Sequence, residues 1–438
     1  MKKTIRLRQI LLFLGDIILY YSALIITIIL NFQKQEIQSA LSQHILPFTF
    51  ILPVWLLIFF LFGFYQLEKL KTRYLIIKQT LVAFLVAGIL SVVFFYLTPF
   101  FGIAPKTNLL IFGTIFLLFV LLWRFFLAQI WKSYFKKNIL VVGAGEEIEN
   151  FIKTLKSSPQ FGYSIVATLK SWDAETVKNL ISKNKIHIIV LDKRNFSLGS
   201  QRMLYFLLSR GIDIWDFYFA YESIFQKIPI NHIDYGWFMN NLKEGEKLFV
   251  DKIKRLIDIL LAIIFIIISL PLSLLISLSI KLEDRGPIFY KQKRVGKNLK
   301  EFYIYKFRSM IPDAEKSVVV WAQENDPRIT KVGRFLRKTH LDELPQMINI
   351  LKGDISFVGP RPERPEFVKE LEKKIPFYNL RHIIKPGFTG WAQIKFRYAR
   401  SIEDTFQKLE YDLYYIKNRS LILDLYILIK TINLLFRG

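Results

Sequence analysis

The stretch LIDILLAIIFIIISLPLSLLISLSI, residues 256–280, decides how the C-terminal part of the chain is arranged. A straight helix of this length, rising about 1.5 Å per residue, is long enough to cross a bilayer. Basic residues nevertheless stand on both sides of it: Lys252, Lys254 and Arg255 before it, and Lys281, Arg285, Lys291, Lys293 and Arg294 after it. Because lysine and arginine favour the cytoplasmic side of a membrane, both ends of the run are predicted to face the cytoplasm.

Pro271, inside this run, indicates how the helix returns. Proline lacks a backbone N–H and kinks a helix, and the Ser269 hydroxyl is able to cover a freed backbone carbonyl. We therefore predict a re-entrant helix hairpin over residues 256–280, with Ser269 and Pro271 at the bend. The alternative is an ordinary fifth span, which would place everything after Lys281 outside the cell.

Four other apolar stretches fill the first third of the chain, at residues 10–30, 45–64, 76–96 and 109–130. Each is near the length that spans a bilayer core, so residues 1–135 are predicted to form a four-helix transmembrane bundle. Basic residues gather before the first stretch, between the second and third, and after the fourth, which places both ends of the bundle in the cytoplasm. Asp16, inside the first stretch, is interpreted as solvated or paired with another helix rather than as a functional intramembrane charge.

The composition excludes several kinds of site. The 438-residue chain is 52% hydrophobic and has a formal net charge of +25. Beside long apolar runs, this charge fits anionic headgroups and phosphate-bearing substrates better than nucleic acid, which is not expected as a partner. The sequence has no cysteine, which rules out thiolate zinc sites and cysteine nucleophiles. Its five histidines lack metal-ligand spacing, which argues against a transition-metal centre.

Residues 138–237 have the composition of a cytosolic α/β domain. Strand-like residues 139–142 precede Gly143-Ala144-Gly145, and further strand candidates follow at residues 163–169, 186–191 and 212–217. This order predicts a Rossmann-like domain. The dinucleotide fingerprint is incomplete, because Ile148 stands where a third glycine is needed and no acidic residue closes the second strand. A structural or regulatory domain is therefore favoured over a working NAD site, and residues 238–255 are interpreted as a charged linker.

Asp342 and Glu343 are the candidate reaction centre, in the string HLDELPQ at residues 340–346. Apolar residues follow them at helical spacing, so Asp342 is predicted near a helix N-cap, where the helix dipole favours an ionised carboxylate and attracts a phosphate. Two adjacent anions repel unless a cation lies between them. Mg²⁺ is the hard ion that oxygen ligands and a diphosphate share. An isolated Asp-Glu pair is most often a solvated helix start, so its surroundings must support the assignment.

Basic residues in apolar or proline-stiffened sequence supply those surroundings: Lys306, Arg308, Arg334, Arg337 and Arg361. The planar fork of arginine suits phosphate oxygens, and the prolines around Arg361 reduce the entropy lost in holding it. The glycine-punctuated segment KPGFTGWAQ, residues 385–393, has room for a nucleotide. No GxxxxGK[ST] loop occurs, which argues against an ATPase or kinase of the P-loop kind.

Several motifs in order across residues 255–438 resemble the bacterial sugar transferases, the polyprenyl-phosphate phosphoglycosyl transferases. The segments that carry the resemblance are residues 254–258, 285–289, 306–310, 341–346, 359–365 and 385–393. The preceding bundle and Rossmann-like domain are similar to those of the long-chain members that start exopolysaccharide or O-antigen repeat units. One departure lies at the predicted bend, where the usual adjacent Ser-Pro is replaced by Ser269-Leu270-Pro271.

The resemblance implies a monotopic α/β catalytic domain over residues 256–438, facing the cytoplasm from the bacterial inner membrane. It implies a ping-pong reaction in which Asp342 takes a phosphosugar from a UDP-sugar, releases UMP, and passes the phosphosugar to undecaprenyl phosphate. Glu343 would hold Mg²⁺. Arg337 and Arg361 are the first choices for phosphate contacts. Weaker candidates for substrate binding complete the set: Lys306, Arg308 and Arg397, each weighed equally against a structural ion pair, and Asp412, which is similar to a family acidic position.

Two other functions stay open. A membrane glycosyltransferase would pass the sugar alone and release UDP. A non-enzymatic assembly or sensor protein would leave the C-terminal unit inert, although clustered unpaired charges argue against that. Glucose or galactose is the sugar expected from the family, with N-acetylhexosamines as alternatives. The expected partners are the UDP-sugar donor, the polyprenyl phosphate acceptor and membrane lipid, and a homodimer is left open.

Overall fold

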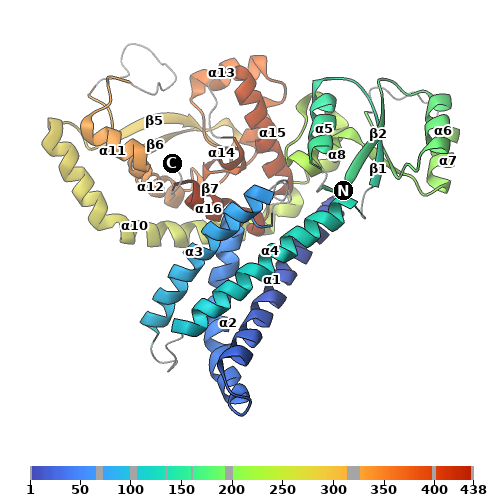
Figure 1. Ribbon diagram of the computed structural model, residues 1–438. Helices are drawn as coiled ribbons and strands as arrows, with labels where there is room; N and C mark the ends of the chain where they lie inside the picture. Colours follow the sequence, from blue (N-terminus) through green and yellow to red (C-terminus); the bar gives the residue numbers. More distant parts are fainter. Residues whose placement is uncertain are drawn as a thin grey trace. The chain divides into compact units, whose positions relative to one another are not determined.

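The computed structural model describes residues 2–65, 73–98, 106–133, 137–158, 161–192, 201–312, 326–396 and 401–435. The chain divides into two compact units, Met1–Ser223 and Ile224–Gly438. Figure 1 labels their elements, and each unit is described by itself.

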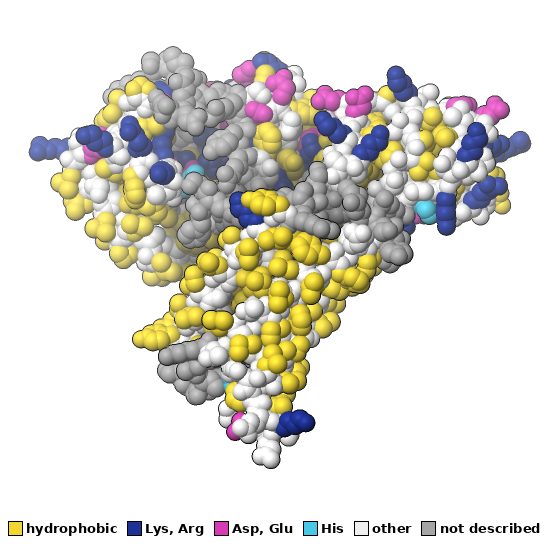
Figure 2. Space-filling model, in the orientation of Figure 1, with side chains coloured by type: hydrophobic (Ala, Val, Ile, Leu, Met, Phe, Trp, Pro, Cys, Tyr) yellow, Lys and Arg dark blue, Asp and Glu magenta, His cyan; other side chains and the backbone are white. Residues whose placement is uncertain are grey.

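Four long helices make up the membrane part of the first unit, within the described residues: α1 (Lys2–Asn31), α2 (Ile37–Leu61), α3 (Arg73–Leu97) and α4 (Lys106–Ser133). Each is long and apolar enough to cross a membrane, in agreement with the four predicted stretches. Aromatic rings of Tyr20, Trp55 and Phe112 fill the buried centre, packed edge to face. Figure 2 shows hydrophobic side chains over the outer surface of these helices, as contact with lipid requires.

Asp16 is paired with another helix, which was one of the two states predicted for it. It is fully buried on α1 and forms an ion pair of 2.6 Å with Arg124 of α4. The ring of Phe64 lies 5.1 Å from the Arg124 guanidinium. Because a charge buried among apolar helices is costly without a partner, this pair favours one pairing of α1 with α4.

A parallel four-stranded sheet follows, in the order β2-β1-β3-β4. Its strands are β1 (Lys137–Val142), β2 (Tyr163–Leu169), β3 (Ile188–Leu191) and β4 (Asp213–Asp216). The helices are α5 (Glu146–Ser157), α6 (Ala174–Lys183), α7 (Gln201–Ser209) and α8 (Phe217–Phe225), and Figure 1 shows helices on both faces of the sheet. The central strands β1 and β3 are accordingly buried on both sides, as in parallel sheets generally.

The first turn of α5 carries Glu146, Glu147 and Glu149. In a Rossmann fold this N-terminus receives the pyrophosphate of a dinucleotide. Three carboxylates there would repel that anion, which gives a physical reason, besides the incomplete glycine motif, to favour a structural or regulatory role for this sheet domain.

The second unit contains a long helix, two small sheets and several short helices. Its helices are α9 (Tyr235–Asn241), α10 (Leu248–Asp284), α11 (Lys331–Thr339), α12 (Gln346–Lys352), α13 (Pro365–Lys374), α14 (Trp391–Lys395), α15 (Ile402–Asn418) and α16 (Leu421–Leu435). Strands β5 (Phe289–Val295) and β6 (Glu301–Phe307) form an antiparallel pair, and β7 (Ser356–Val358) pairs with β8 (Gly387–Thr389) in parallel. Residues 238–255, predicted as a linker, are helical for much of their length.

Helix α10 runs unbroken through Pro271 for 37 residues, and Figure 1 shows it bending along its length. The region predicted as a hairpin is therefore a bent helix, without a turn between two shorter helices. Pro271 leaves the carbonyl of Ile267 without its usual donor. The Ser269 hydroxyl donates to the carbonyl of Ile266 instead, at 3.4 Å, so the prediction that it covers the freed carbonyl is wrong.

Hydrogen bonds tie the N-terminal end of α10 to helix α12 and strand β7. Arg255 donates to the carbonyls of Ile350 and Leu351 at the end of α12. Asp258, which is buried, accepts from the backbone N–H of Phe357 in β7 at 3.1 Å. This end of the helix therefore lies against the same α/β body that carries Asp342 and Glu343, the carboxylate dyad.

The C-terminal end of α10 returns to that body. Ile276 and Ile280 pack in a small core with Phe307 and Leu336. Glu283 accepts from the first backbone N–H of α11 at 2.7 Å. Between the two ends, large apolar side chains remain exposed: Ile263, Ile264, Phe265, Ile267, Ile268, Leu270, Leu272, Leu274 and Leu275. Figure 2 shows hydrophobic side chains gathered on this part of the surface.

Candidate active site

The dyad lies in a tight turn between two helices. Helix α11 ends at Thr339, its C-cap His340 has a left-handed φ of 57°, and residues Leu341–Glu343 form a single 3-10 turn. Helix α12 begins only at Gln346, after Pro345. Asp342, predicted near the N-cap of this helix, therefore lies one turn before the N-cap in the structure, Pro345, which lacks a backbone N–H and precedes the first helical residue. The helix dipole contributes less to Asp342 than the sequence suggested.

Glu343 is held by two cations that lie far from it in the sequence. Its Oε1 atom accepts from Lys306 Nζ and from an Arg361 terminal nitrogen, each at 2.7 Å. Lys306 lies on β6, and Arg361 lies on the loop after β7. The structure thus brings together three of the predicted site residues. Their charges offset the repulsion between the two adjacent carboxylates, which on sequence alone called for a metal cation.

Asp342 is the free member of the dyad. Its side chain is buried, with 7% of the residue surface exposed, and it makes no hydrogen bond or ion pair among the described residues. Burial raises the pKa of Asp342 above its ordinary value, and the charge of Lys306 only partly opposes this. Burial also acts to raise the pKa of Glu343, but Arg361 and Lys306 outweigh it, so that pKa lies below its ordinary range. The Glu343 carboxylate is thus neutralised and held in place, whereas the Asp342 carboxylate is available to a substrate.

Arg337 is placed to act on the same site. Its Nε donates to the Ser309 hydroxyl at 2.9 Å, and its charge helps to lower the pKa of Asp342. Its two terminal nitrogens have no partner within the part of the chain that the structure describes, so they are available to a phosphate.

Arg308 occupies a different position. Its guanidinium is buried and forms an ion pair with Asp284 at the end of α10, which is the structural alternative weighed for it. Arg397 lies outside the described residues.

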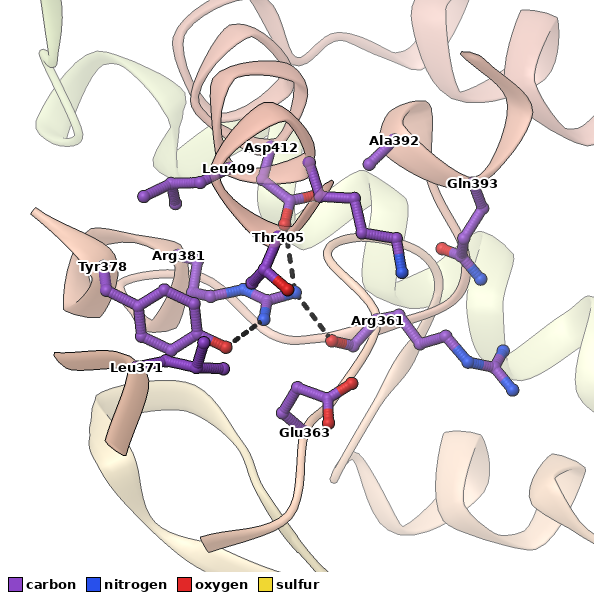
Figure 3. A pocket seen from close by; sticks show the side chains of 11 residues that line it. Arg361, Glu363, Leu371, Tyr378, Arg381, Ala392, Gln393, Thr405, Leu409 and Asp412 are labelled. Atoms are coloured by element: carbon purple, nitrogen blue, oxygen red, sulfur yellow. Dashed lines mark hydrogen bonds and ion pairs between the residues drawn. The ribbon is translucent and has the colours of Figure 1, made fainter. Parts of the chain in front are cut away.

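Asp412 belongs to a buried network beside the dyad, drawn in Figure 3. It pairs with Arg381 at 3.0 Å, and Arg381 also donates to the Tyr378 hydroxyl at 2.7 Å and to the backbone carbonyl of Arg361 at 2.8 Å. Asp412 thus orients Arg381, and through it the loop that presents Arg361 to Glu343. Neither Arg381 nor Tyr378 was predicted from the sequence, because neither stands in a pattern that marks a site.

Next to this network, His382 is buried and provides a stability prediction. Burial, together with the charge of Arg381, lowers the pKa of His382 to about 3. Because the unfolded chain takes up this proton near pH 6.5, the free energy of unfolding should fall by up to about 1.4 kcal/mol for each pH unit below 6.5.

Thermal unfolding of the detergent-purified protein between pH 4 and 8 measures this effect. His382→Gln should flatten the pH dependence, whereas His340→Asn, at an exposed site, should leave it unchanged. If the stability of His382→Gln depended on pH as steeply as that of the unmodified protein, His382 would not be the group responsible for the pH dependence.

The donor set limits how a metal could bind. Among the described residues, no group of three or more histidine and acidic side chains could hold an ion. Two groups could bind an ion: the Asp342 carboxylate, and the Oε2 atom of Glu343, which has no hydrogen-bond partner among those residues. Mg²⁺ commonly takes one or two carboxylates together with waters and substrate phosphates. The residues present therefore fit a magnesium ion shared with a diphosphate.

Two family models match the chain. Residues 249–438 match the family described as bacterial sugar transferase, and residues 60–186 match a family described as CoA-binding domain. The first match covers α10, the dyad and the Arg381 network.

Individual relatives are enzymes that act on undecaprenyl phosphate. The chain is 43% identical over 217 residues to a UDP-N-acetylgalactosamine-undecaprenyl-phosphate N-acetylgalactosaminephosphotransferase of Aeromonas hydrophila, covering 50% of this chain and 51% of that protein. It is 44% identical over 190 residues to a UDP-glucose:undecaprenyl-phosphate glucose-1-phosphate transferase of Escherichia coli (strain K12). This match covers 42% of this chain and 40% of that protein. These two matches span about half or less of each relative.

A third match is longer. The chain is 30% identical over 346 residues to an undecaprenyl-phosphate galactose phosphotransferase of Salmonella typhimurium, covering 69% of this chain and 68% of that protein.

Proposed function

Because the chain belongs to the bacterial sugar transferase family, we propose that it transfers a sugar 1-phosphate from a UDP-sugar to undecaprenyl phosphate and releases UMP. The observation that carries the proposal is the asymmetry of the dyad. Glu343 is neutralised by Lys306 and Arg361, while Asp342 is buried and has no partner among the described residues. A desolvated, unpaired carboxylate with a raised pKa is suited to attack phosphorus.

In the first half-reaction, an oxygen of ionised Asp342 attacks the sugar-bearing phosphorus. The bond from that phosphorus to the bridging oxygen of the diphosphate breaks, and its electron pair leaves on the oxygen of UMP. In the second half-reaction, a phosphate oxygen of undecaprenyl phosphate attacks the same phosphorus. The bond to Asp342 then breaks, which restores the carboxylate and yields the diphosphate-linked sugar.

Cations around the dyad are positioned to stabilise the charge that develops on the phosphoryl oxygens. The terminal nitrogens of Arg337 have no partner among the described residues, and Lys306 and Arg361 adjoin the dyad through Glu343. Glu343 and Asp342 would hold a bound Mg²⁺ ion, which would neutralise part of the negative charge of the diphosphate. Arg308 is not assigned to this task, because it is engaged with Asp284.

Helix α10 is proposed to enter one membrane leaflet and return, as the basic residues on both sides of residues 256–280 predicted. Both of its ends contact the same α/β body, through Arg255 and Asp258 at one end and through Glu283 at the other. A helix that crossed the bilayer would carry its two ends to opposite sides. The exposed apolar middle of α10 then lies in lipid, and the acceptor phosphate at the headgroup plane lies close to a catalytic body on the cytoplasmic side of the inner membrane.

This topology can be tested by labelling, since the chain has no cysteine of its own. Lys373→Cys, exposed on α13, should react with a membrane-impermeant maleimide only after spheroplasts are permeabilised. Lys34→Cys, exposed between α1 and α2, should react in intact spheroplasts and serves as the matched control. Labelling of Lys373→Cys in intact spheroplasts would refute the cytoplasmic placement of the catalytic body.

The sugar is proposed to be a hexose. Glucose is named for a relative at 44% identity, N-acetylgalactosamine for one at 43% and galactose for one at 30% over a longer stretch. The decisive experiment incubates the purified protein with Mg²⁺, undecaprenyl phosphate and each of these UDP-sugars, and identifies the nucleotide released. UMP supports phosphosugar transfer and names the sugar. UDP would instead establish a glycosyltransferase, and no nucleotide product from any of the three would refute the proposal.

A further inference from the structure

A pocket next to the dyad contains a lysine, Lys408, that has no hydrogen-bond or ion-pair partner among the described residues. The pocket is lined by α15 residues Thr405, Lys408 and Asp412, by Arg361 and Arg381, and by Gln393 of α14, among others, and most of them are drawn in Figure 3. Arg381 and Asp412 neutralise each other at 3.0 Å, and the nearby Glu363 lies 3.7 Å from Arg294. Lys408 makes no hydrogen bond or ion pair with any residue that the structure describes.

An ammonium in such a place is unfavourable until an anion reaches it. Burial lowers the pKa of Lys408, and the charges of Glu363 and Asp412 only partly compensate for the lost hydration. Partly buried charges are normally paired, because losing water without gaining a partner costs free energy. The unpaired lysine therefore indicates a pocket that is complete only with an anionic ligand.

Arg361 joins this pocket to the dyad. Its side chain lines the pocket and also donates to Glu343 Oε1, and its backbone carbonyl accepts from Arg381. An anion bound at Lys408 would thus be one side chain away from the reaction centre. That position suits the part of the donor that departs, since the phosphosugar itself must lie at Asp342.

Gln393 adds a polar acceptor to the same pocket. Its amide nitrogen donates to the carbonyl of Phe388 at 3.0 Å, which fixes the orientation of the amide. Its Oε1 atom is buried without a hydrogen-bond partner among the described residues, and Figure 3 shows the amide beside Arg361 at the pocket. A ligand that fits both groups has a phosphate and, next to it, a hydroxyl or N–H donor. A nucleoside monophosphate has this combination.

We propose that Lys408 binds the phosphate of the departing UMP and that Gln393 accepts a hydrogen bond from its nucleoside. This inference rests on the proposed function. When the bond between the sugar-bearing phosphorus and the bridging oxygen breaks, that oxygen gains negative charge on the UMP phosphate. Lys408 offsets this charge, so it acts on leaving-group departure and on UMP affinity rather than on transfer to undecaprenyl phosphate.

The test measures UMP binding to the purified full-length protein by calorimetry in the presence of Mg²⁺. Lys408→Met should weaken UMP binding by about tenfold or more, the loss expected when one charge-assisted contact is removed. Lys408→Arg should retain most of the affinity. Lys369→Met, which removes an exposed lysine on α13, is the control for the change in net charge and should bind UMP like the unmodified protein.

Thermal stability without ligand separates this role from a structural one. Removing an unpaired ammonium should leave the melting temperature of the ligand-free protein unchanged or raised, while removing half of a stabilising ion pair would lower it. UMP affinity of Lys408→Met within twofold of the unmodified protein would overturn the proposal. If the methionine variant does not fold, Lys408→Gln is measured in its place with the same criterion.

The two proposals fail in different ways. Identification of the nucleotide released by the unmodified protein tests the reaction and does not involve Lys408. The comparison of UMP affinities among the lysine variants tests the pocket and does not require turnover.

Discussion

Asp342→Asn is expected to abolish UMP release, with a loss of roughly 10⁴-fold or more, the scale seen when an enzyme nucleophile is removed. Asparagine has nearly the same shape, so the 3-10 turn at Leu341–Glu343 can persist. What it lacks is the anionic oxygen that must form the bond to phosphorus. Because Asp342 has no partner among the described residues, the substitution breaks no contact there, and the fold should keep its stability.

The measurement is the rate of UMP formation, together with a search for a covalent intermediate. After incubation with labelled UDP-sugar and acid quench, the unmodified protein should retain the labelled phosphosugar and Asp342→Asn should not. Asp213→Asn, an exposed change on β4, is the matched control and should behave like the unmodified protein. Retention of near-normal UMP release by Asp342→Asn would remove Asp342 from the nucleophile's role.

Glu343→Gln is also expected to abolish turnover, for a different physical reason. The substitution leaves Lys306 and Arg361 without the carboxylate that now accepts from both at 2.7 Å. It also removes one of the two carboxylates that fit a magnesium ion. Here the fold should be destabilised as well, by about 1–3 kcal/mol, less than for a fully buried pair because Arg361 is 41% exposed.

The two variants together distinguish the competing reactions. A glycosyltransferase that passes only the sugar needs no nucleophile at position 342, so Glu343→Gln would then be the more damaging change. In the ping-pong reaction, Asp342→Asn and Glu343→Gln should each abolish UMP formation. UMP release and melting temperature should be measured for both proteins, and activity comparable to the unmodified protein in folded Glu343→Gln would sink the role given to Glu343.

Several features could be predicted because they depend on residues that are neighbours in the chain. Apolar runs of spanning length predicted the four helices of the bundle, since hydropathy and length are local properties. The strands at residues 137–142, 163–169 and 188–191 lie where buried β-rich runs predicted them. Asp342 and Glu343 are adjacent, so their proximity follows from the sequence itself.

The cations around the dyad show where prediction from sequence stops. Lys306 and Arg308 are two residues apart and were given equal weight. In the structure β6 ends at Phe307, so strand alternation no longer governs Arg308, which pairs with Asp284 while Lys306 reaches Glu343. Which cation pairs with which carboxylate depends on where strand β6 ends and on the elements packed near that end. The local sequence pattern does not contain this information.

The sequence by itself determined the membrane character of the chain, its parallel α/β domain and the two carboxylates of the site. Tertiary structure alone decided which of those carboxylates is free, that α10 continues through Pro271 and brings both ends to one body, and that Lys408 faces a pocket beside Arg361. The physical reason is distance along the chain. Hydropathy and adjacency act over a few residues, whereas pairing of a buried charge depends on groups far away in the sequence, as for Asp16 and Arg124, 108 residues apart, that only folding brings together.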